Sequence, residues 1–136
     1  LSKIASALGV SAAHLIDFPA GLQVSVTRPG RRLVLTLPDV AVEAEILTRE
    51  QPYAEITLLL VTLGPNQPRE MIREARPGDK FLHIIEGLVE VKVGDNKYLL
   101  KRGDSLHFKA SQPQCLMNVG DGPCRIFWAD WPRYTL

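Results

Sequence analysis

The segment RPGDKFLHIIEGLVEVKVGDNKYLLKRGDSLHFKASQPQCLMN, residues 76–118, decides the fold of this 136-residue chain. Within it, Val89, Val91 and Val93 occupy every second position, which is the period of a strand with one buried face. The turn Gly94-Asp95-Asn96 follows, and glycine and Asx residues tolerate the positive φ that tight hairpins require. The segment therefore predicts a β-hairpin.

Short strand-like runs continue on both sides of this hairpin. Residues 105–108 follow the turn Arg102-Gly103-Asp104, and residues 125–128 follow the glycine-rich turn at 119–123. Upstream, residues 55–63 are nearly all apolar, so we expect a central strand that is covered on both faces. Short strands separated by turns at this spacing predict a mainly β sandwich or barrel.

The order of these turns resembles the two sequence motifs of the cupin superfamily. The resemblance covers roughly residues 31 to 131 and implies a double-stranded β-helix, or jelly roll. We therefore expect a cupin domain over residues 31–136. The matching positions are Ile85-Glu86-Gly87, Gly94-Asp95, Gly103-Asp104, Pro113 and Asn118.

The first 17 residues predict two short helices. Apolar residues recur at helical spacing from Leu1 to Leu8, Gly9 suits a helix C-terminus, and Ser11 is a good N-cap. Such a pair cannot bury its apolar stripe alone. Because the chain starts at leucine instead of methionine, we expect further residues upstream in the intact protein.

The same helices resemble the last two helices of the lambda-repressor-like (XRE) helix-turn-helix family, especially at Lys3-Ile4-Ala5 and Ala7-Leu8-Gly9-Val10-Ser11. In that family the helix that enters the major groove lies before this point, so we expect DNA to be bound by a missing N-terminal part. Residues 1–17 are thus the expected helix-turn-helix remnant and residues 18–30 the linker. The linker arginines are either solvated or contact phosphate.

Composition sets further limits. The net charge of +1 gives no general reason to expect nucleic-acid binding, and 46% apolar residues suffice for a packed core. No apolar run approaches a membrane span, so we expect a cytoplasmic protein. Cys115 and Cys124 flank the turn at 119–123 at equal offsets. They either face each other across a hairpin as a redox pair or are two small buried residues.

Metal-binding cupins resemble one another in placing histidines and a glutamate at fixed positions of the two motifs. In this chain those positions hold Glu74, Arg76, Lys80 and Gln114. Arginine, a protonated lysine and an amide are poor ligands, so we expect no metal, no cofactor and no enzyme activity. The three histidines, His14, His83 and His107, fall away from these positions.

Strand alternation points Lys80 to the same face as Leu82 and Ile84, and thus into the barrel. Two cations and an amide there suit the carboxylate or phosphate of a small metabolite. Alternatively, Arg76 and Lys80 pair with nearby Glu74 or Asp79, or reach solvent. The candidate ligand-binding residues are Arg76, Lys80, Gln114, Glu74 and Asn118.

The leading hypothesis is an effector-sensing and dimerisation domain of a DNA-binding transcriptional regulator, held as a homodimer and binding a small anionic or zwitterionic metabolite. One alternative is a cupin-fold enzyme of the isomerase or dioxygenase type with a degenerate metal site. Another is a dimerisation module without a ligand.

Overall fold

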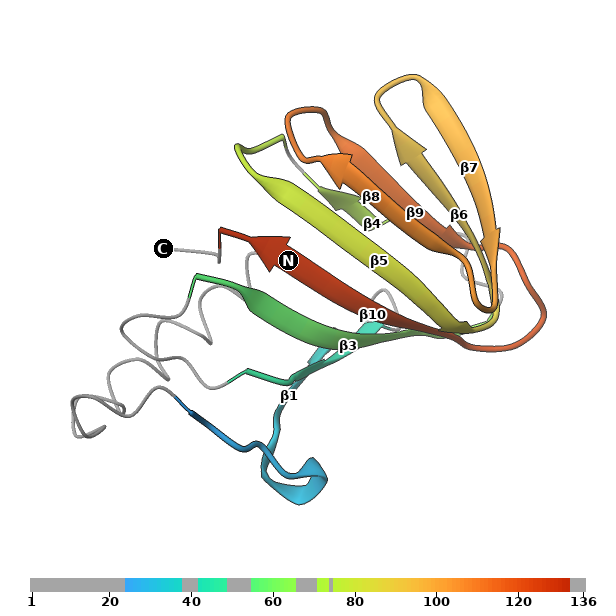
Figure 1. Cartoon of the computed structure of the whole chain (residues 1–136). Coiled ribbons are helices and arrows are strands. Elements are labelled where there is room, and N and C mark those ends of the chain that lie inside the picture. Colours follow the sequence, from blue (N-terminus) through green and yellow to red (C-terminus); the bar gives the residue numbers. More distant parts are fainter. Residues whose placement is uncertain (1–23, 38–41, 49–54, 66–70, 74, 133–136) are drawn as a thin grey trace.

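The computed structural model describes residues 24–37, 42–48, 55–65, 71–73 and 75–132. In this part of the chain the fold is mainly β, and two antiparallel sheets pack face to face (Figure 1). The predicted jelly roll is therefore confirmed. The two predicted helices lie outside the described residues.

The larger sheet has six strands in the order β1-β2-β3-β10-β5-β8, and every neighbouring pair is antiparallel. A short 3-10 turn, η1 (Pro29–Arg31), precedes it. Its strands are β1 (Leu33–Leu37), β2 (Val42–Ile46), β3 (Thr57–Leu63), β5 (Asp79–Glu86), β8 (Ser105–Lys109) and β10 (Cys124–Trp131).

The smaller sheet has four strands in the order β4-β9-β6-β7. It contains the predicted hairpin, because Val93 pairs with Asn96 across the turn and Gly94 has a φ of 57°. That left-handed conformation is one that glycine adopts without strain. Its strands are β4 (Met71–Arg73), β6 (Leu88–Val93), β7 (Asn96–Lys101) and β9 (Gln114–Asn118).

The core lies between the sheets and follows from strand alternation. On β5 the residues Lys80, Leu82 and Ile84 point inward and are buried, as predicted. The remaining apolar core comes from both sheets, so neither sheet can bury its inner face without the other. Its fully buried members include Leu59, Val61, Val89, Val91, Leu116, Ile126 and Trp128.

One of the two alternatives for the cysteines is excluded, and one expectation about a strand is wrong in detail. Cys115 lies on β9 in the smaller sheet and Cys124 on β10 in the larger one, so they do not face each other across a hairpin. The turn between them crosses from one sheet to the other. Strand β3 is central, but only its inner face is buried, and the alternate residues on its outer face are half-buried.

Among the described residues, no helix combines the length and the apolar character that crossing a membrane requires.

Candidate functional site

A row of buried polar residues crosses the inner face of the larger sheet at one end of the barrel. Asp130 on β10 pairs with Thr57 on β3 and with Lys80 on β5. All three are buried. Gln114, at the start of β9 in the opposite sheet, is buried as well. The alternation of short strands thus brings polar groups from both sheets to one level of the core.

Lys80 is the centre of this group. Its Nζ lies 3.1 Å from Asp130 Oδ1 and donates a hydrogen bond to Gln114 Oε1 at 3.3 Å. The same atom lies 4.7 Å from the ring centroid of Trp128, where a cation is attracted by the aromatic face. Trp128 Nε1 donates to Asp130 Oδ2 at 2.9 Å. We call these four residues the buried charge cluster.

The amide of Gln114 is also engaged at its other end. Gln114 Nε2 donates to the carbonyl oxygen of Ala110 at 3.4 Å and to that of Gln112. Gln114 therefore ties the cluster to the loop between β8 and β9. A polar group that is buried without such partners would destabilise the fold.

Asp130 supplies the counter-charge that the sequence analysis left open. The side chains of Lys80 and Asp130 are 0% and 2% exposed, so their charges meet away from water. Burying two ions is costly, and the attraction between them offsets that cost only in close, hydrogen-bonded geometry. Asp79, the partner considered from sequence, points to the other face of β5. The pairing of Lys80 therefore lies within the barrel.

Arg76 lies beside the cluster, and its guanidinium contacts the backbone just after β10. Its Nη2 donates to the carbonyl oxygen of Pro132 at 2.9 Å. Its backbone N–H donates at 2.7 Å to the carbonyl oxygen of Ala110, which also accepts the bond from Gln114. Arg76 is thus a neighbour of the cluster at the end of the barrel. Glu74 lies outside the described residues.

Asn118 is separated from the cluster. It lies four residues beyond Gln114 on β9, or roughly 13 Å at the rise of an extended strand. Its Nδ2 donates to the carbonyl oxygens of Leu63, Gly64 and Gly122 at 3.2, 2.8 and 2.9 Å. Its Oδ1 accepts from the N–H of Gly120 at 2.9 Å. The structure places Asn118 as a clamp on backbone groups at the opposite end of the barrel.

Sequence reasoning brought Lys80 and Gln114 to one place correctly but missed Asp130 and Trp128. Both lie on β10, where they alternate with Phe127 and Ala129. That alternation was visible in the sequence and would have placed an aspartate and a tryptophan on one face. What it could not give was the register that sets Asp130 opposite Lys80.

A second charged group lies on the outside of the same sheet. Asp79 Oδ1 is 2.9 Å from Lys109 Nζ and 3.4 Å from His107 Nε2. The hydrogen bond from Lys109 is the main cause that lowers the pKa of Asp79, and His107 adds to it. His83 Nδ1 lies 2.8 Å from Ser105 Oγ. Both described histidines therefore belong to the surface, away from the buried charge cluster.

The cluster does not have the donors of a metal centre. Across the part of the chain that the structure describes, no three His, Cys, Asp or Glu side chains are grouped to hold a metal ion. At the cluster itself, Asp130 contacts the ammonium of Lys80 and the indole of Trp128, and the amide of Gln114 contacts that ammonium. A divalent metal would require three or four neutral imidazole, thiolate or carboxylate ligands converging on one point.

Comparison with solved structures agrees with the architecture. The hydroxypropylphosphonic acid epoxidase from S. wedmorenis superimposes with a TM-score of 0.71 at 22% identity, over 85% of this chain and 62% of its own. An HTH_3 family transcriptional regulator from Vibrio cholerae gives 0.60 at 17%, over 71% and 55%. The cupin domain of an XRE family transcriptional regulator from Enterobacter cloacae gives 0.61 at 16%, over 68% and 99%. At these identities the similarity shows a shared fold.

The sequence comparisons identify the family. An uncharacterized protein of Methanocaldococcus jannaschii, MJ1618, is 21% identical over 77 residues, which are 57% of this chain and 62% of that protein. The chain thus spans about three fifths of the length of this curated relative. Residues 59–130 match the cupin domain family. Since that match covers more than half of the sequence and ends within the last strand, the chain belongs to the cupin domain family.

Proposed function

We propose that this chain is the effector-sensing and dimerisation domain of a DNA-binding transcriptional regulator, and that it is not an enzyme. The observation that carries the proposal is the buried charge cluster. Lys80 and Gln114 stand where the cupin motifs of metal enzymes have ligands, and here Lys80 contacts both Asp130 and Gln114. Two regulator structures with this fold and the helix-turn-helix resemblance of residues 1–15 add support.

The cluster favours a zwitterionic effector over a simple anion. Because Asp130 already balances the charge of Lys80, the barrel has no unmatched cation there that needs an external anion. A ligand with both an ammonium and a carboxylate can exchange one internal ion pair for two, with its ammonium on Asp130 and its carboxylate on Lys80. A plain anion would leave Asp130 buried without a cation.

A thermal-shift screen tests this preference. Amino acids and related zwitterions are compared with matched acids and amines that lack one of the two charges. A ligand that binds only the folded state raises the melting temperature by mass action, so zwitterions should raise it by several degrees and their one-charge analogues should not. Lys80→Met removes the cation that would hold the ligand's carboxylate and should abolish the shift.

Lys97→Met is the matched control, because Lys97 is an exposed cation of the other sheet. It should leave the shift unchanged. Equal stabilisation by simple anions would contradict the zwitterion preference, and a screen without any hit would leave the chain as a dimerisation module.

The competing candidate is a cupin enzyme. It is favoured by the epoxidase neighbours, one of which is described as an Fe(II) form. The donors of the buried charge cluster do not fit iron, so we expect no stoichiometric transition metal in protein that is purified without chelators. Elemental analysis decides this, and about one equivalent of iron, zinc, manganese or nickel per chain would overturn the proposal in favour of an enzyme.

A further inference from the structure

A band of apolar side chains crosses the middle of the outer face of the six-stranded sheet. Strand alternation gives it seven apolar side chains that point away from the core, and Trp131 among them is 50% exposed. Phe81 and Phe127 meet edge to face with their centroids 6.5 Å apart. The seven residues are Val34, Leu58, Leu60, Phe81, Phe127, Ala129 and Trp131.

The strand register makes this surface continuous. Leu60 pairs with Phe127, and Leu58 pairs with Ala129, which in turn pairs with Phe81. Five apolar side chains thus cover the three central strands β3, β10 and β5 without a charged residue between them. Contiguous apolar surface on this scale marks an interaction site more often than scattered exposed residues do.

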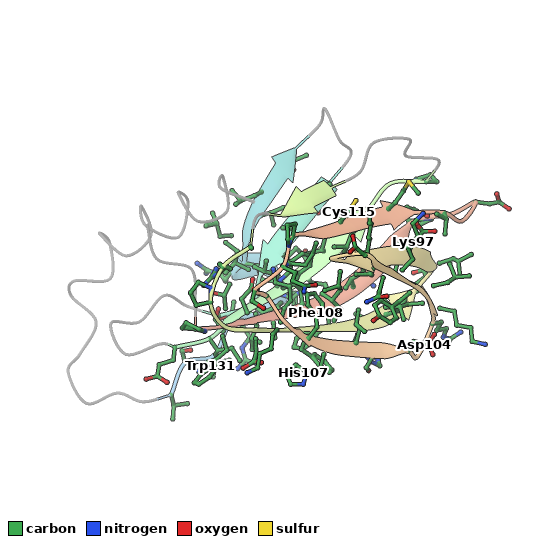
Figure 2. The ribbon with its side chains drawn as sticks, turned by 90° about the horizontal axis from the view of Figure 1, so that it is seen from above. Lys97, Asp104, His107, Phe108, Cys115 and Trp131 are labelled. Carbon is green, nitrogen blue, oxygen red and sulfur yellow. The ribbon has the colours of Figure 1, made fainter. Side chains whose placement is uncertain are left out.

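Within the described residues, no third layer covers this face, since every described strand belongs to one of the two sheets. Figure 2 shows Trp131 and His107 on this side of the molecule, with Cys115 and Lys97 on the opposite side and Phe108 between the sheets. On the outer face of the smaller sheet, Lys92 stands directly opposite Lys97.

We infer that the outer face of the six-stranded sheet binds the same face of a second copy of this chain. The two copies of the six-stranded sheet then face each other across a two-fold axis that is parallel to the strands and passes between β3 and β10. This axis sets β3 of one copy over β10 of the other, and β2 over β5. Such an interface is isologous, which is the usual form of a homodimer.

The surface is complementary to itself under that operation. Leu60 then meets Phe127 of the second copy, and Glu45 meets its His83, because all four lie in one cross-strand row. Glu45, which pairs with Arg32 of its own chain at 3.0 Å, therefore faces an imidazole of the second copy, on both sides of the axis. A carboxylate opposite an imidazole is a complementary polar pair, and such pairs fix the register of an interface.

The area is sufficient for a stable dimer. Six strands spaced by about 4.8 Å, with five to eight residues each rising by about 3.4 Å, give a face of roughly 24 by 21 Å. Two such faces together bury on the order of 1,000 Å², which is about the least that a specific interface needs. The inference deepens the dimerisation part of the proposed function and does not depend on metabolite sensing.

The test is the molar mass of the full chain in solution, measured by light scattering over a dilution series. The wild-type chain should be a dimer at micromolar concentration. Leu60→Lys places like charges near the two-fold axis and should raise the dissociation constant at least tenfold. Leu99→Lys is the matched control, since Leu99 is an exposed leucine of the smaller sheet, and it should remain dimeric.

A second pair of variants separates loss of association from loss of folding. His83→Glu alone sets an acidic side chain opposite Glu45 of the second copy and should weaken the dimer, and the addition of Glu45→Lys should restore it, since opposite charges then face each other across the interface. A monomeric wild-type chain overturns dimerisation altogether. A folded Leu60→Lys variant that stays dimeric, or dissociation caused by Leu99→Lys, overturns only the assignment of the face.

Discussion

Two neighbouring residues of β5, Asp79 and Lys80, carry opposite charges and point to opposite sides of the sheet. Each has an ionic partner at nearly the same distance, 2.9 Å from Asp79 to Lys109 and 3.1 Å from Lys80 to Asp130. The inner pair is 0% and 2% exposed, whereas the outer pair is 24% and 75% exposed. One residue along a strand therefore separates an ion pair in the core from one in water.

The comparison shows that the distance between two charges does not by itself determine how much their ion pair contributes to stability. In water the two charges of the outer pair remain hydrated and screened, so its contribution to stability is small. In the core each charge of the inner pair depends on the other, because neither can turn to solvent. The two pairs should therefore respond very differently to the loss of one partner.

The largest expected effect follows from breaking the inner pair. Lys80→Met removes the cation and leaves Asp130 buried with an uncompensated charge, which should lower the free energy of unfolding by about 3–5 kcal/mol. Urea denaturation followed by circular dichroism measures it. A decrease in the free energy of unfolding below about 1 kcal/mol, the range of a surface pair, would show that the inner and outer ion pairs of β5 contribute alike.

The double variant Lys80→Met, Asp130→Leu is the control for this effect. It removes both charges, so it should recover part of the stability lost in the single variant. Recovery should be incomplete, because Trp128 Nε1 loses its acceptor and an unsatisfied buried donor costs about 1–3 kcal/mol. A double variant less stable than Lys80→Met alone would show that Asp130 is held chiefly by other partners.

A smaller effect is expected at the outer pair and depends on pH. Because the pKa of Asp79 is lowered in the folded state, its contribution to stability is present above the ordinary aspartate pKa of about 3.9 and is lost as the pH falls through the folded value. Lys109→Ala should raise the pKa of Asp79 toward its ordinary value and leave neutral-pH stability nearly unchanged. NMR titration of the Asp79 carboxyl measures the shift, and an unchanged pKa would contradict the assignment to Lys109.

The smallest expected effect is a difference in reactivity between the buried thiol of Cys124 and the half-buried thiol of Cys115. Burial is the main cause that raises the pKa of Cys124, whose Sγ donates to the carbonyl oxygen of Leu88 at 3.1 Å. Cys115 is only half-buried. Since the thiolate is the reactive form, iodoacetamide at pH 8 should label Cys115 first and Cys124 only on unfolding. Equal labelling rates, followed by mass spectrometry, would show that burial does not separate the two thiols.

Much of this fold could be predicted because strand alternation and turn chemistry are local. The hairpin at Gly94, the inward face of Lys80 and the short strands around them all follow from neighbours in sequence. The sheet partners do not. Cys115 and Cys124 look like a facing pair from their spacing, yet the chain between them leaves one sheet and enters the other. Only the jelly-roll topology decides that.

The candidate site shows the same limit. Lys80 and Gln114 could be placed inside the barrel from motif spacing, but the counter-charge was sought nearby, at Glu74 or Asp79. The structure supplies it from Asp130, fifty residues along the sequence. A buried ion must have a partner, and that requirement does not say how far away the partner lies.

The clamp at Asn118 has a consequence for chemical ageing of the protein. Its Nδ2 donates hydrogen bonds to three carbonyl oxygens from two separate chain segments. Deamidation would convert this side chain to aspartate with almost no change in shape, and the three attractive contacts would become three repulsive ones between oxygens. Asn118 is only 4% exposed, which keeps water from the amide. At this position, even a replacement of equal size would therefore break the contacts.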